Sequence, residues 1–407
     1  SPKYHVVVAN PPYMGGKGMN GRLGEFLKEN FREGKNDLMT SFLQRVERFV
    51  ADRGYHASVT LDSWMFLSSF SELRYTLLQS SAVESCLHVG WNCFPDGHVY
   101  NRGTAVVLSK GKPEPTKAKF LNLSTLPAST DKHLAFLDSD IFLNSLSVKS
   151  SRDFLKVPGS PFAYWASEKF LKAFSEESVA TLFEGEGKNI TSDNDRFLRQ
   201  VWEVEFSKVG REKKWLIYAK GGNFRKWSGN LEHVVNWSDT ARQYYSSHSS
   251  GRIIPEKFWY RKGVTWSPIA TAGIGFRELP ADTTFDTKGL AVFPKGEREE
   301  AILLSVLNSC FGFESLEMIN PTLTINLIDV KAVPLPKDFT TDVTNSSKKA
   351  VLLARSDWDA YETSWDFTTL PLLQPDHRAE TLEDTYTTLR THWQGMTDEM
   401  QRLEEEN

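Results

Sequence analysis

The eight residues from Val6 to Tyr13 limit the possible fold of this chain more than any other part of its sequence. They read Val-Val-Val-Ala-Asn-Pro-Pro-Tyr. The run Val6–Ala9 is apolar and rich in β-branched residues, which is typical of a fully buried strand. The strand is expected to end there, because the two prolines that follow have no N–H to donate to a sheet ladder. Ligands bind at the carboxyl ends of strands in open parallel sheets, so we expect Asn10 and Tyr13 to lie beside a pocket.

This short segment has the groups needed for chemistry on a planar amine. Asn10 Oδ1 and the Pro11 carbonyl are two acceptors that can hold both hydrogens of an exocyclic amine and expose the lone pair of its nitrogen. Tyr13 can stack on the ring that carries the amine, as aromatic residues do in base-flipping enzymes. The residues alone leave a second interpretation open, in which Pro11 and Pro12 only form a turn after a strand.

Composition narrows the class of protein. The chain has 407 residues, of which 40% are hydrophobic and 25% charged, as expected for a soluble globular chain of about two to three domains. No apolar run approaches the ~18 residues of a membrane span, and no signal peptide is recognisable. Three cysteines, Cys86, Cys93 and Cys310, are too few for a disulfide framework. The sequence therefore predicts a cytoplasmic protein that does not enter a membrane.

Charge is unevenly distributed along the chain, although the formal net charge is only −4. Residues 208–227 contain seven Lys or Arg and one acidic residue, whereas residues 357–407 contain thirteen Asp or Glu and three Arg. Local charge rather than net charge decides contact with phosphates. The basic middle of the chain is therefore compatible with nucleic-acid binding.

The first 110 residues alternate between strand and helix patterns. Asn36 and Asp37 can cap a helix with an apolar face from Leu38 to Val50. Strands are expected at 56–61, 83–91 and 103–109, with a further helix at 70–78. This order predicts an α/β sheet with right-handed crossovers.

Four segments of this region resemble, in order and spacing, motifs IV, V, VI and VIII of the N6-adenine DNA methyltransferases. They are Asn10-Pro-Pro-Tyr13, Asn36-Asp-Leu-Met-Thr-Ser-Phe-Leu43, Leu61-Asp-Ser-Trp64, and Cys93-Phe94-Pro95 followed by Asn101 to Leu108. The order resembles that of the γ subgroup. The resemblance implies that Asn10, Pro11, Pro12 and Tyr13 form the catalytic segment. It also implies that Tyr13 and Phe94 stack on the flipped adenine.

The same resemblance implies S-adenosylmethionine as cofactor and double-stranded DNA as substrate. The family's glycine-rich motif I should lie upstream of motif IV, and Gly185-Glu-Gly187 and Gly273-Ile-Gly275 are in the wrong place for it. We therefore expect a partial Rossmann-like methyltransferase sheet, with the cofactor site mostly on a missing N-terminal half. A fragment without motif I is expected to be inactive alone.

The predicted organisation has four parts. Residues 1–125 are the C-terminal half of the catalytic domain, 126–160 a connection without regular structure, 161–340 an α+β target-recognition domain, and 341–407 a C-terminal helical segment. The segment 161–340 resembles target-recognition domains of type IIG and type I systems. Its candidate DNA-binding residues are Lys213, Lys214, Lys220, Arg225, Lys226, Trp227, Arg261, Lys262 and Trp266, because cations neutralise phosphates and flat rings contact sugars or bases. The alternative is that these Trp residues are core and the Lys residues merely solvated.

The C-terminal segment narrows the resemblance further. Together with the motifs above, the stretch from Asp357 to Phe367 resembles the adenine-specific methyltransferases of BREX (phage growth limitation type) defence systems. This implies a function in phage defence, with other BREX subunits as partners. The charge pattern separately raises the hypothesis that phage proteins mimicking DNA bind the basic face as inhibitors. A helix is expected from Ala379 to Glu406, with one apolar seam for another helix.

Other chemistries find less support in the sequence. Cys86, His88, Cys93 and His98 lie close together, but their spacing fits no usual zinc site, so no metal site is predicted. No P-loop, Gly-x-Ser-x-Gly or His-Glu-x-x-His pattern is present. The main alternative to an adenine methyltransferase is a DNA-binding or interaction module of a defence complex that has no catalytic activity.

Overall fold

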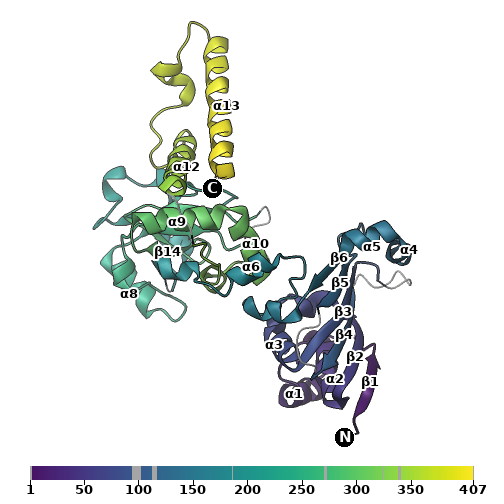
Figure 1. The fold of residues 1–407 in the computed structure, drawn as a ribbon. Coiled ribbons are helices and arrows are strands. Elements are labelled where there is room, and N and C mark those ends of the chain that lie inside the picture. Colours follow the sequence, from purple (N-terminus) through teal and green to yellow (C-terminus); the bar gives the residue numbers. More distant parts are fainter. Residues whose placement is uncertain are drawn as a thin grey trace. The chain divides into compact units, whose positions relative to one another are not determined.

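A computed structural model of the chain describes residues 2–93, 102–111, 117–185, 187–269, 273–322, 324–337 and 341–406. The chain divides into two compact units. The first contains residues up to Glu176 together with Met318–Pro321, and the second contains Glu177–Glu317 and the residues from Thr322 onward. Each unit is described separately below, and both are drawn in Figure 1.

The first unit is built on a six-stranded sheet in the order β1-β2-β4-β3-β5-β6. Strands β1 and β2 are parallel, as are β3 and β5, whereas β4 is antiparallel to both β2 and β3. The strands are β1 (Tyr4–Ala9), β2 (Val50–Leu61), β3 (Ser81–Gly90), β4 (Gly103–Lys110), β5 (Ala118–Asn122) and β6 (Leu146–Lys149). The helices are α1 (Gly21–Asn30), α2 (Leu38–Phe49), α3 (Ser71–Ser80), α4 (Lys132–Leu137), α5 (Ser139–Ser145) and α6 (Glu168–Ala173). This arrangement confirms the predicted α/β fold class.

Helix α2 begins where the sequence predicts, because Asp37 caps it. Asp37 Oδ1 accepts a hydrogen bond from the backbone N–H of Met39 at 3.0 Å, and a second from that of Met14 at 3.3 Å. The same carboxylate therefore starts the helix and ties down the segment that follows Tyr13.

One face of the sheet carries the core of the first unit. Met39 and Leu43 of α2 and Leu73 and Leu77 of α3 pack there against side chains from β3, β4 and β5, including Phe120. Successive residues of a strand point to opposite faces, so only alternate residues of each strand enter this core.

Strand β1 differs from its prediction as a fully buried strand. It lies at the edge of the sheet, and β2 is its one partner among the described strands. Val6 and Val8 are 59% and 77% exposed. An apolar run indicates a strand made to be covered on both faces, but it does not show which neighbours are present.

The prediction of a connection without regular structure over residues 126–160 was wrong. Helices α4 and α5 and strand β6 lie in this stretch, and β6 extends the sheet beyond β5. The segment is rich in Ser and Lys and has short elements, which is why its periodicity did not reveal them. The structure also divides the chain after Glu176, whereas the sequence predicts a boundary at residue 160.

The second unit contains two four-stranded sheets, in the orders β13-β9-β10-β8 and β12-β11-β14-β7. The strands are β7 (Phe183–Glu184), β8 (Leu198–Gln200), β9 (Trp215–Ala219), β10 (His233–Asn236), β11 (Gly263–Trp266), β12 (Phe276–Leu279), β13 (Thr283–Phe285) and β14 (Leu290–Pro294). The helices are α7 (Asn194–Phe197), α8 (Asp239–Ser247), α9 (Glu297–Asn308), α10 (Cys310–Ile319), α11 (Leu327–Lys331), α12 (Thr341–Asp359) and α13 (Leu382–Glu406). Strands and helices are therefore mixed, as predicted for an α+β domain.

The C-terminal helices pack on the second unit. Helix α12 lies against α9 and against α13. Of the apolar seam predicted on α13, Leu389 and Leu403 are buried, whereas Leu382, Tyr386 and Trp393 remain exposed. Among the described residues, no single helix is long and apolar enough to cross a membrane. Only α9 and α10 taken together pass by length and composition, and they are bent by 70° relative to each other.

We predict that Gly221→Ala destabilises the second unit by more than about 2 kcal/mol. Gly221 has a φ of +82°, and a Cβ built on it would lie 2.2 Å from the carbonyl oxygen of Lys288. A left-handed conformation alone costs a side chain ~1–2 kcal/mol, and the clash adds to this. Denaturant unfolding measures the loss.

A comparison variant in the first unit is Gly111→Ala, at a glycine with a φ of +61° and no atom of the described residues within 4 Å of the built Cβ. It should lose only the ~1–2 kcal/mol of the backbone conformation. Equal losses in the two variants would show that the approach of Lys288 contributes nothing.

Candidate functional site

The segment Asn10–Tyr13 leaves the carboxyl end of β1 and turns toward β2. The Tyr13 hydroxyl donates to Asn10 Oδ1 at 3.2 Å, and lies 3.5 Å from the carbonyl oxygen of Val59 in β2. Asn10 and Pro12 are exposed, whereas Pro11 is buried and Tyr13 is half-buried against the core of the unit. Tyr13 thus orients the Asn10 amide while its ring remains partly accessible.

The surroundings of Tyr13 keep its hydroxyl protonated. Burial raises the pKa of the Tyr13 hydroxyl, and the neighbouring Cys93 thiol raises it further. The hydroxyl therefore stays protonated at neutral pH and remains a donor to Asn10 Oδ1. Phe94, the second predicted stacking residue, lies outside the described residues.

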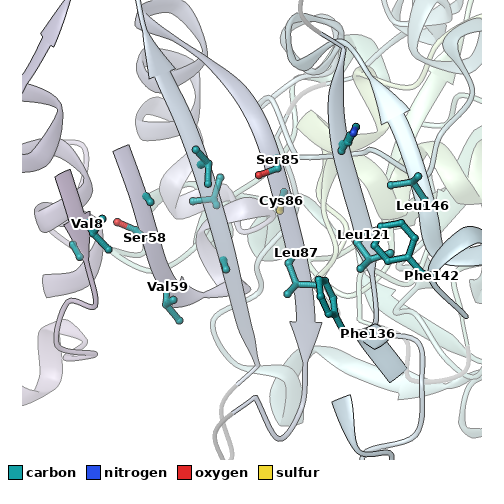
Figure 2. Close-up of a pocket in the computed structure, with 16 residues that line it drawn as sticks. Val8, Ser58, Val59, Ser85, Cys86, Leu87, Leu121, Phe136, Phe142 and Leu146 are labelled. Atoms are coloured by element: carbon teal, nitrogen blue, oxygen red, sulfur yellow. The ribbon is translucent and has the colours of Figure 1, made fainter. Parts of the chain in front are cut away.

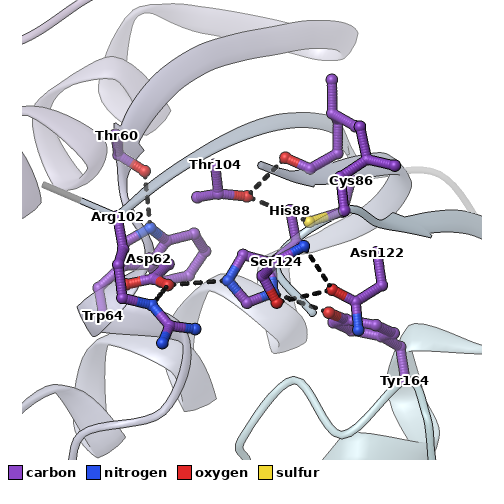
Figure 3. Close-up of polar contacts among 12 residues, drawn as sticks. Thr60, Asp62, Trp64, Cys86, His88, Arg102, Thr104, Asn122, Ser124 and Tyr164 are labelled. Carbon is purple, nitrogen blue, oxygen red and sulfur yellow. Dashed lines mark hydrogen bonds and ion pairs between the residues drawn. The ribbon is translucent and has the colours of Figure 1, made fainter. Parts of the chain in front are cut away.

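A buried polar cluster lies beside this segment, where β2 and β3 end and β4 begins. His88 Nε2 lies 2.8 Å from Asp62 Oδ2, and His88 Nδ1 lies 2.7 Å from the Tyr164 hydroxyl. Arg102 Nε donates to the same Asp62 oxygen at 2.7 Å. Figure 3 shows Asp62 joined to both His88 and Arg102 by dashed lines.

The proton positions in this cluster follow from Tyr164. Burial raises the pKa of the Tyr164 hydroxyl well above its usual range, so this hydroxyl stays protonated. We assign it as the donor to His88 Nδ1, which places the imidazole proton on Nε2, facing Asp62. The Asp62 carboxylate then accepts from His88 on one side and from Arg102 on the other.

The open face of the sheet, opposite the core, forms a shallow apolar groove of about 400 Å³. Figure 2 shows Val8, Val59 and Leu87 along this face, with Phe136 and Phe142 at one end. The groove contains few polar groups, so it is a packing surface rather than a site for chemistry.

The second unit places the predicted DNA-binding residues in three different situations. Trp227 and Trp266 are only 2% and 0% exposed, so their rings belong to the core rather than to a surface. Arg225, Lys226, Arg261 and Lys262 lie at the surface but are paired with Asp357, Glu404, Glu184 and Glu300 respectively. Within the described part of the chain, no ion pair involves Lys213, Lys214 or Lys220.

Burial of Trp227 and Trp266 corrects the expectation that both rings contact DNA. Trp227 Nε1 donates to Glu404 Oε1 at 2.8 Å, and Trp266 Nε1 donates to the Ile325 carbonyl at 3.1 Å. Buried indole rings are stable when their N–H has a partner, and both have found one inside the unit. A prediction made from interleaved basic and aromatic residues therefore places too many rings at the surface.

The cysteines and histidines weighed as zinc ligands lie partly outside the described residues. In the described ranges, no group of three or more His, Cys, Asp or Glu side chains could hold a metal ion. Cys86 is buried on β3, and its Sγ lies 3.4 Å from the Thr104 hydroxyl. His98 lies outside the described residues.

Comparison with known proteins finds related sequences and related folds. A family model described as "Eco57I restriction-modification methylase" matches residues 1–94. The adenine-specific methyltransferase BrxX of Escherichia coli O9:H4 (strain HS) is 34% identical over 91% of this chain and 31% of its own length. The adenine-specific methyltransferase PglX of Lacticaseibacillus casei (strain Zhang) is 32% identical over 98% of this chain and 35% of its own length.

The chain is a homologue of the BrxX and PglX adenine-specific methyltransferases. This confirms the resemblance found in the sequence motifs. The chain spans about a third of the length of these relatives. Among solved structures, the type IIL restriction-modification enzyme MmeI in complex with DNA aligns with a TM-score of 0.50 at 10% identity, covering 94% of this chain and 53% of that one. At this identity the alignment supports the fold alone.

Sequence reasoning predicted the Asn10–Tyr13 segment but missed the cluster around Asp62 in this BrxX and PglX homologue. Asp62 was noted only as part of a motif, and His88 only as a zinc candidate. The available signal was their position, since each polar residue lies at or near the end of an apolar strand. Tyr164 lies too far along the chain to be linked to them by any local pattern.

Glu404 links α13 to Lys226 and Trp227, which leads to a prediction. We expect Glu404→Ala to destabilise the second unit by about 1–3 kcal/mol, because it leaves the buried Trp227 N–H without an acceptor. Glu404→Gln keeps an acceptor oxygen and loses only the partly exposed pair with Lys226, so its loss should stay under about 1 kcal/mol. Thermal unfolding compares the two variants.

The neighbouring Glu405→Ala serves as control, because the Glu405 side chain is exposed and accepts only from Gln401 of its own helix. It should change stability by less than about 0.5 kcal/mol. If Glu404→Ala is as mild as Glu405→Ala, the contact with Trp227 does not hold α13 in place.

Proposed function

We propose that this chain is the part of an N6-adenine DNA methyltransferase that holds the target adenine and recognises DNA. The observation that carries the proposal is the geometry of Asn10 and Tyr13 at the carboxyl end of β1. The homologous relatives are named adenine-specific methyltransferases, which is consistent with this geometry.

The chemistry follows from the two acceptors at this edge. Asn10 Oδ1 accepts the Tyr13 hydroxyl with one lone pair and has a second lone pair for one hydrogen of the adenine amine. The Pro11 carbonyl takes the other hydrogen. Both bonds shift electron density onto the nitrogen, which would attack the methyl carbon of the donor. The bond from that carbon to the donor's sulfonium sulfur would break, a neutral thioether would leave, and the methylated nitrogen would lose one proton to water.

The target adenine has to leave the helix to reach this site. Unstacking the base from the duplex costs a few kcal/mol of free energy, and stacking on aromatic side chains partly offsets this cost. We assign this stacking to Tyr13 and Phe94. The partly exposed ring of Tyr13 supports this assignment.

The methyl group comes from S-adenosylmethionine when this cofactor is bound. The two Gly-x-Gly segments of this chain do not fit the cofactor loop of the family. Gly185 and Gly275 lie in the second unit, where a Cβ would approach Val292 and the Arg225 backbone, so their role there is close packing. We propose that the cofactor site lies mostly outside these residues, since the chain spans only about a third of the length of its relatives.

The second unit is assigned to target recognition. Lys213 and Lys214 are exposed and Lys220 is half-buried, and these three are the strongest candidates for phosphate contacts. Four further basic residues are paired with carboxylates and can contact a phosphate only by leaving those partners: Arg225, Lys226, Arg261 and Lys262. Phage defence in the cytoplasm, with BREX subunits as partners and phage DNA mimics as inhibitors, completes the proposal.

Transfer of tritiated methyl groups from S-adenosylmethionine to duplex DNA tests this function. The chain alone and the full-length product of its gene are compared on unmethylated genomic DNA. The proposal predicts transfer by the full-length product and none by the chain alone. Transfer by neither, with DNA binding intact, would favour a binding module without catalytic activity.

A further inference from the structure

The polar cluster around Asp62 is buried except at one point. Asp62, His88 and Tyr164 are 6%, 3% and 1% exposed, whereas the side chain of Arg102 is 41% exposed. All of these side chains belong to the first unit. The cluster therefore presents a single charged group to the surface, and that group is the guanidinium of Arg102.

This arrangement is poorly explained by stability alone. A buried carboxylate and a buried imidazole lose their hydration, and apolar residues of similar volume often stabilise a fold as well or better. The pairing instead fixes the position of Arg102. Its Nε is held by Asp62 at 2.7 Å, and its guanidinium carbon lies 5.9 Å from the centre of the Trp91 ring.

One edge of the Arg102 guanidinium, the one that carries Nη1 and Nη2, has no hydrogen-bond partner among the described residues. Among the hydrogen bonds of the described residues, the Arg102 side chain makes only the one from Nε to Asp62. Its Nη1 and Nη2 therefore remain as two donors on the same edge. Two parallel donors match the two oxygens of a phosphate, which is why arginine binds this group in a bidentate manner.

Arg102 also lies beside the proposed adenine site. Asp62 directly follows the last residue of β2, the strand that Tyr13 contacts through Val59. Cys93 lies between the two groups. The Cys93 thiol raises the pKa of the Tyr13 hydroxyl. On the other side, its Sγ would lie 2.3 Å from a Cβ built on Gly103, the residue that follows Arg102.

We propose that Arg102, held by Asp62 and His88, binds a backbone phosphate of the DNA strand next to the flipped adenine. The inference rests on the proposed function and adds a positioning residue to it. The adenine amine is itself a donor and cannot bind a guanidinium, whereas a strand with one flipped nucleotide brings its phosphates close to the pocket. Arg102 acts by fixing this strand, so that the amine reaches Asn10 and Pro11.

The test uses Arg102→Gln and Arg102→Lys in the full-length gene product, with unmethylated genomic DNA as the probe. Loss of a charge-assisted hydrogen bond predicts a fall of about 10- to 100-fold in kcat/KM for methyl transfer with Arg102→Gln. Arg102→Lys keeps the charge but loses the fork, so its loss should be smaller. The control Arg32→Gln changes an exposed arginine of the same unit and should leave transfer unchanged.

The salt dependence separates a phosphate contact from other roles. A lost phosphate contact should reduce the slope of log kcat/KM against log salt concentration by about 0.9. The double variant Arg102→Gln with Asp62→Asn tests whether the single variant loses activity only because the Asp62 charge is left without its partner. Our proposal predicts that the double variant stays impaired.

The outcomes separate the two proposals. If the wild-type protein transfers methyl groups and Arg102→Gln matches it in rate and salt slope, the Arg102 inference is wrong and the proposed function stands. Recovery of wild-type transfer in the double variant would also overturn it. Absence of transfer by the wild-type protein on any duplex overturns the proposed function and this inference with it.

Discussion

Asn10→Ala should lower methyl transfer by the full-length protein by at least about 10²-fold, while DNA affinity changes by less than about threefold. The side-chain oxygen acts on the amine as charge develops on its nitrogen, and removal of one such group typically costs 10²–10³ in rate. Asn10 is exposed and lies at the end of the edge strand β1, so its loss should not disturb the fold. Steady-state transfer and filter binding measure the two effects.

Two further variants make this result specific. Asn10→Asp keeps an acceptor oxygen and should retain part of the activity. Asn30→Ala removes another exposed amide of the same unit, one that hydrogen-bonds only to the Phe26 carbonyl of its own helix, and should be neutral. Equal loss of transfer and of DNA binding in Asn10→Ala would contradict a role on the amine.

Arg74→Ala is expected to destabilise the first unit by about 4 kcal/mol or more. Arg74 is 1% exposed, and its guanidinium donates to the carbonyls of Trp64, Leu67, Gly159 and Ser160 at 2.7–3.1 Å. Each buried carbonyl left without a donor costs ~1–3 kcal/mol. The variant would also release the chain near Gly159 from α3, because both Gly159 and Ser160 depend on this one side chain.

Denaturant unfolding, monitored by tryptophan fluorescence, measures this loss. Burial lowers the pKa of Arg74 to about 10, so the side chain remains charged at neutral pH and keeps all its donors. Gln79→Ala, at an exposed position of the same helix, should change stability by less than about 0.5 kcal/mol. A loss below about 1 kcal/mol in Arg74→Ala would show that water replaces the guanidinium without penalty.

The elements that sequence analysis predicted best are those with local causes. Helix α2 has its cap at Asp37 and its apolar face within twelve residues, so its position follows from nearby residues alone. The strand after it and the helix α3 are equally periodic. The exposed edge of β1 was not predictable, because a pattern of valines is the same whether neighbouring strands are present or not.

The second unit shows the opposite case. The sequence predicts only its α+β class, whereas the structure has strands of three to four residues such as β8, β10 and β12. These strands are short, and their pairing is decided by residues far along the chain, such as Phe276 opposite Trp266.

The candidate site divides in the same way. Asn10 to Tyr13 are neighbours in sequence, so their chemistry can be read together. Asp62, His88, Arg102 and Tyr164 belong to four separate segments, and only the paired order of β2, β4 and β3 brings the first three together. No local pattern in the sequence links these residues. Taken singly, each is more simply interpreted as a structural residue than as part of a polar cluster.

The identity of the methylated base tests the central claim most directly. Duplex DNA treated with the full-length protein and S-adenosylmethionine is digested to nucleosides and analysed by mass spectrometry. We predict N6-methyldeoxyadenosine, absent when Asn10→Ala replaces the wild-type protein. Methylation of cytosine, or undiminished N6-methyldeoxyadenosine with Asn10→Ala, would contradict the assignment of this segment as the adenine site.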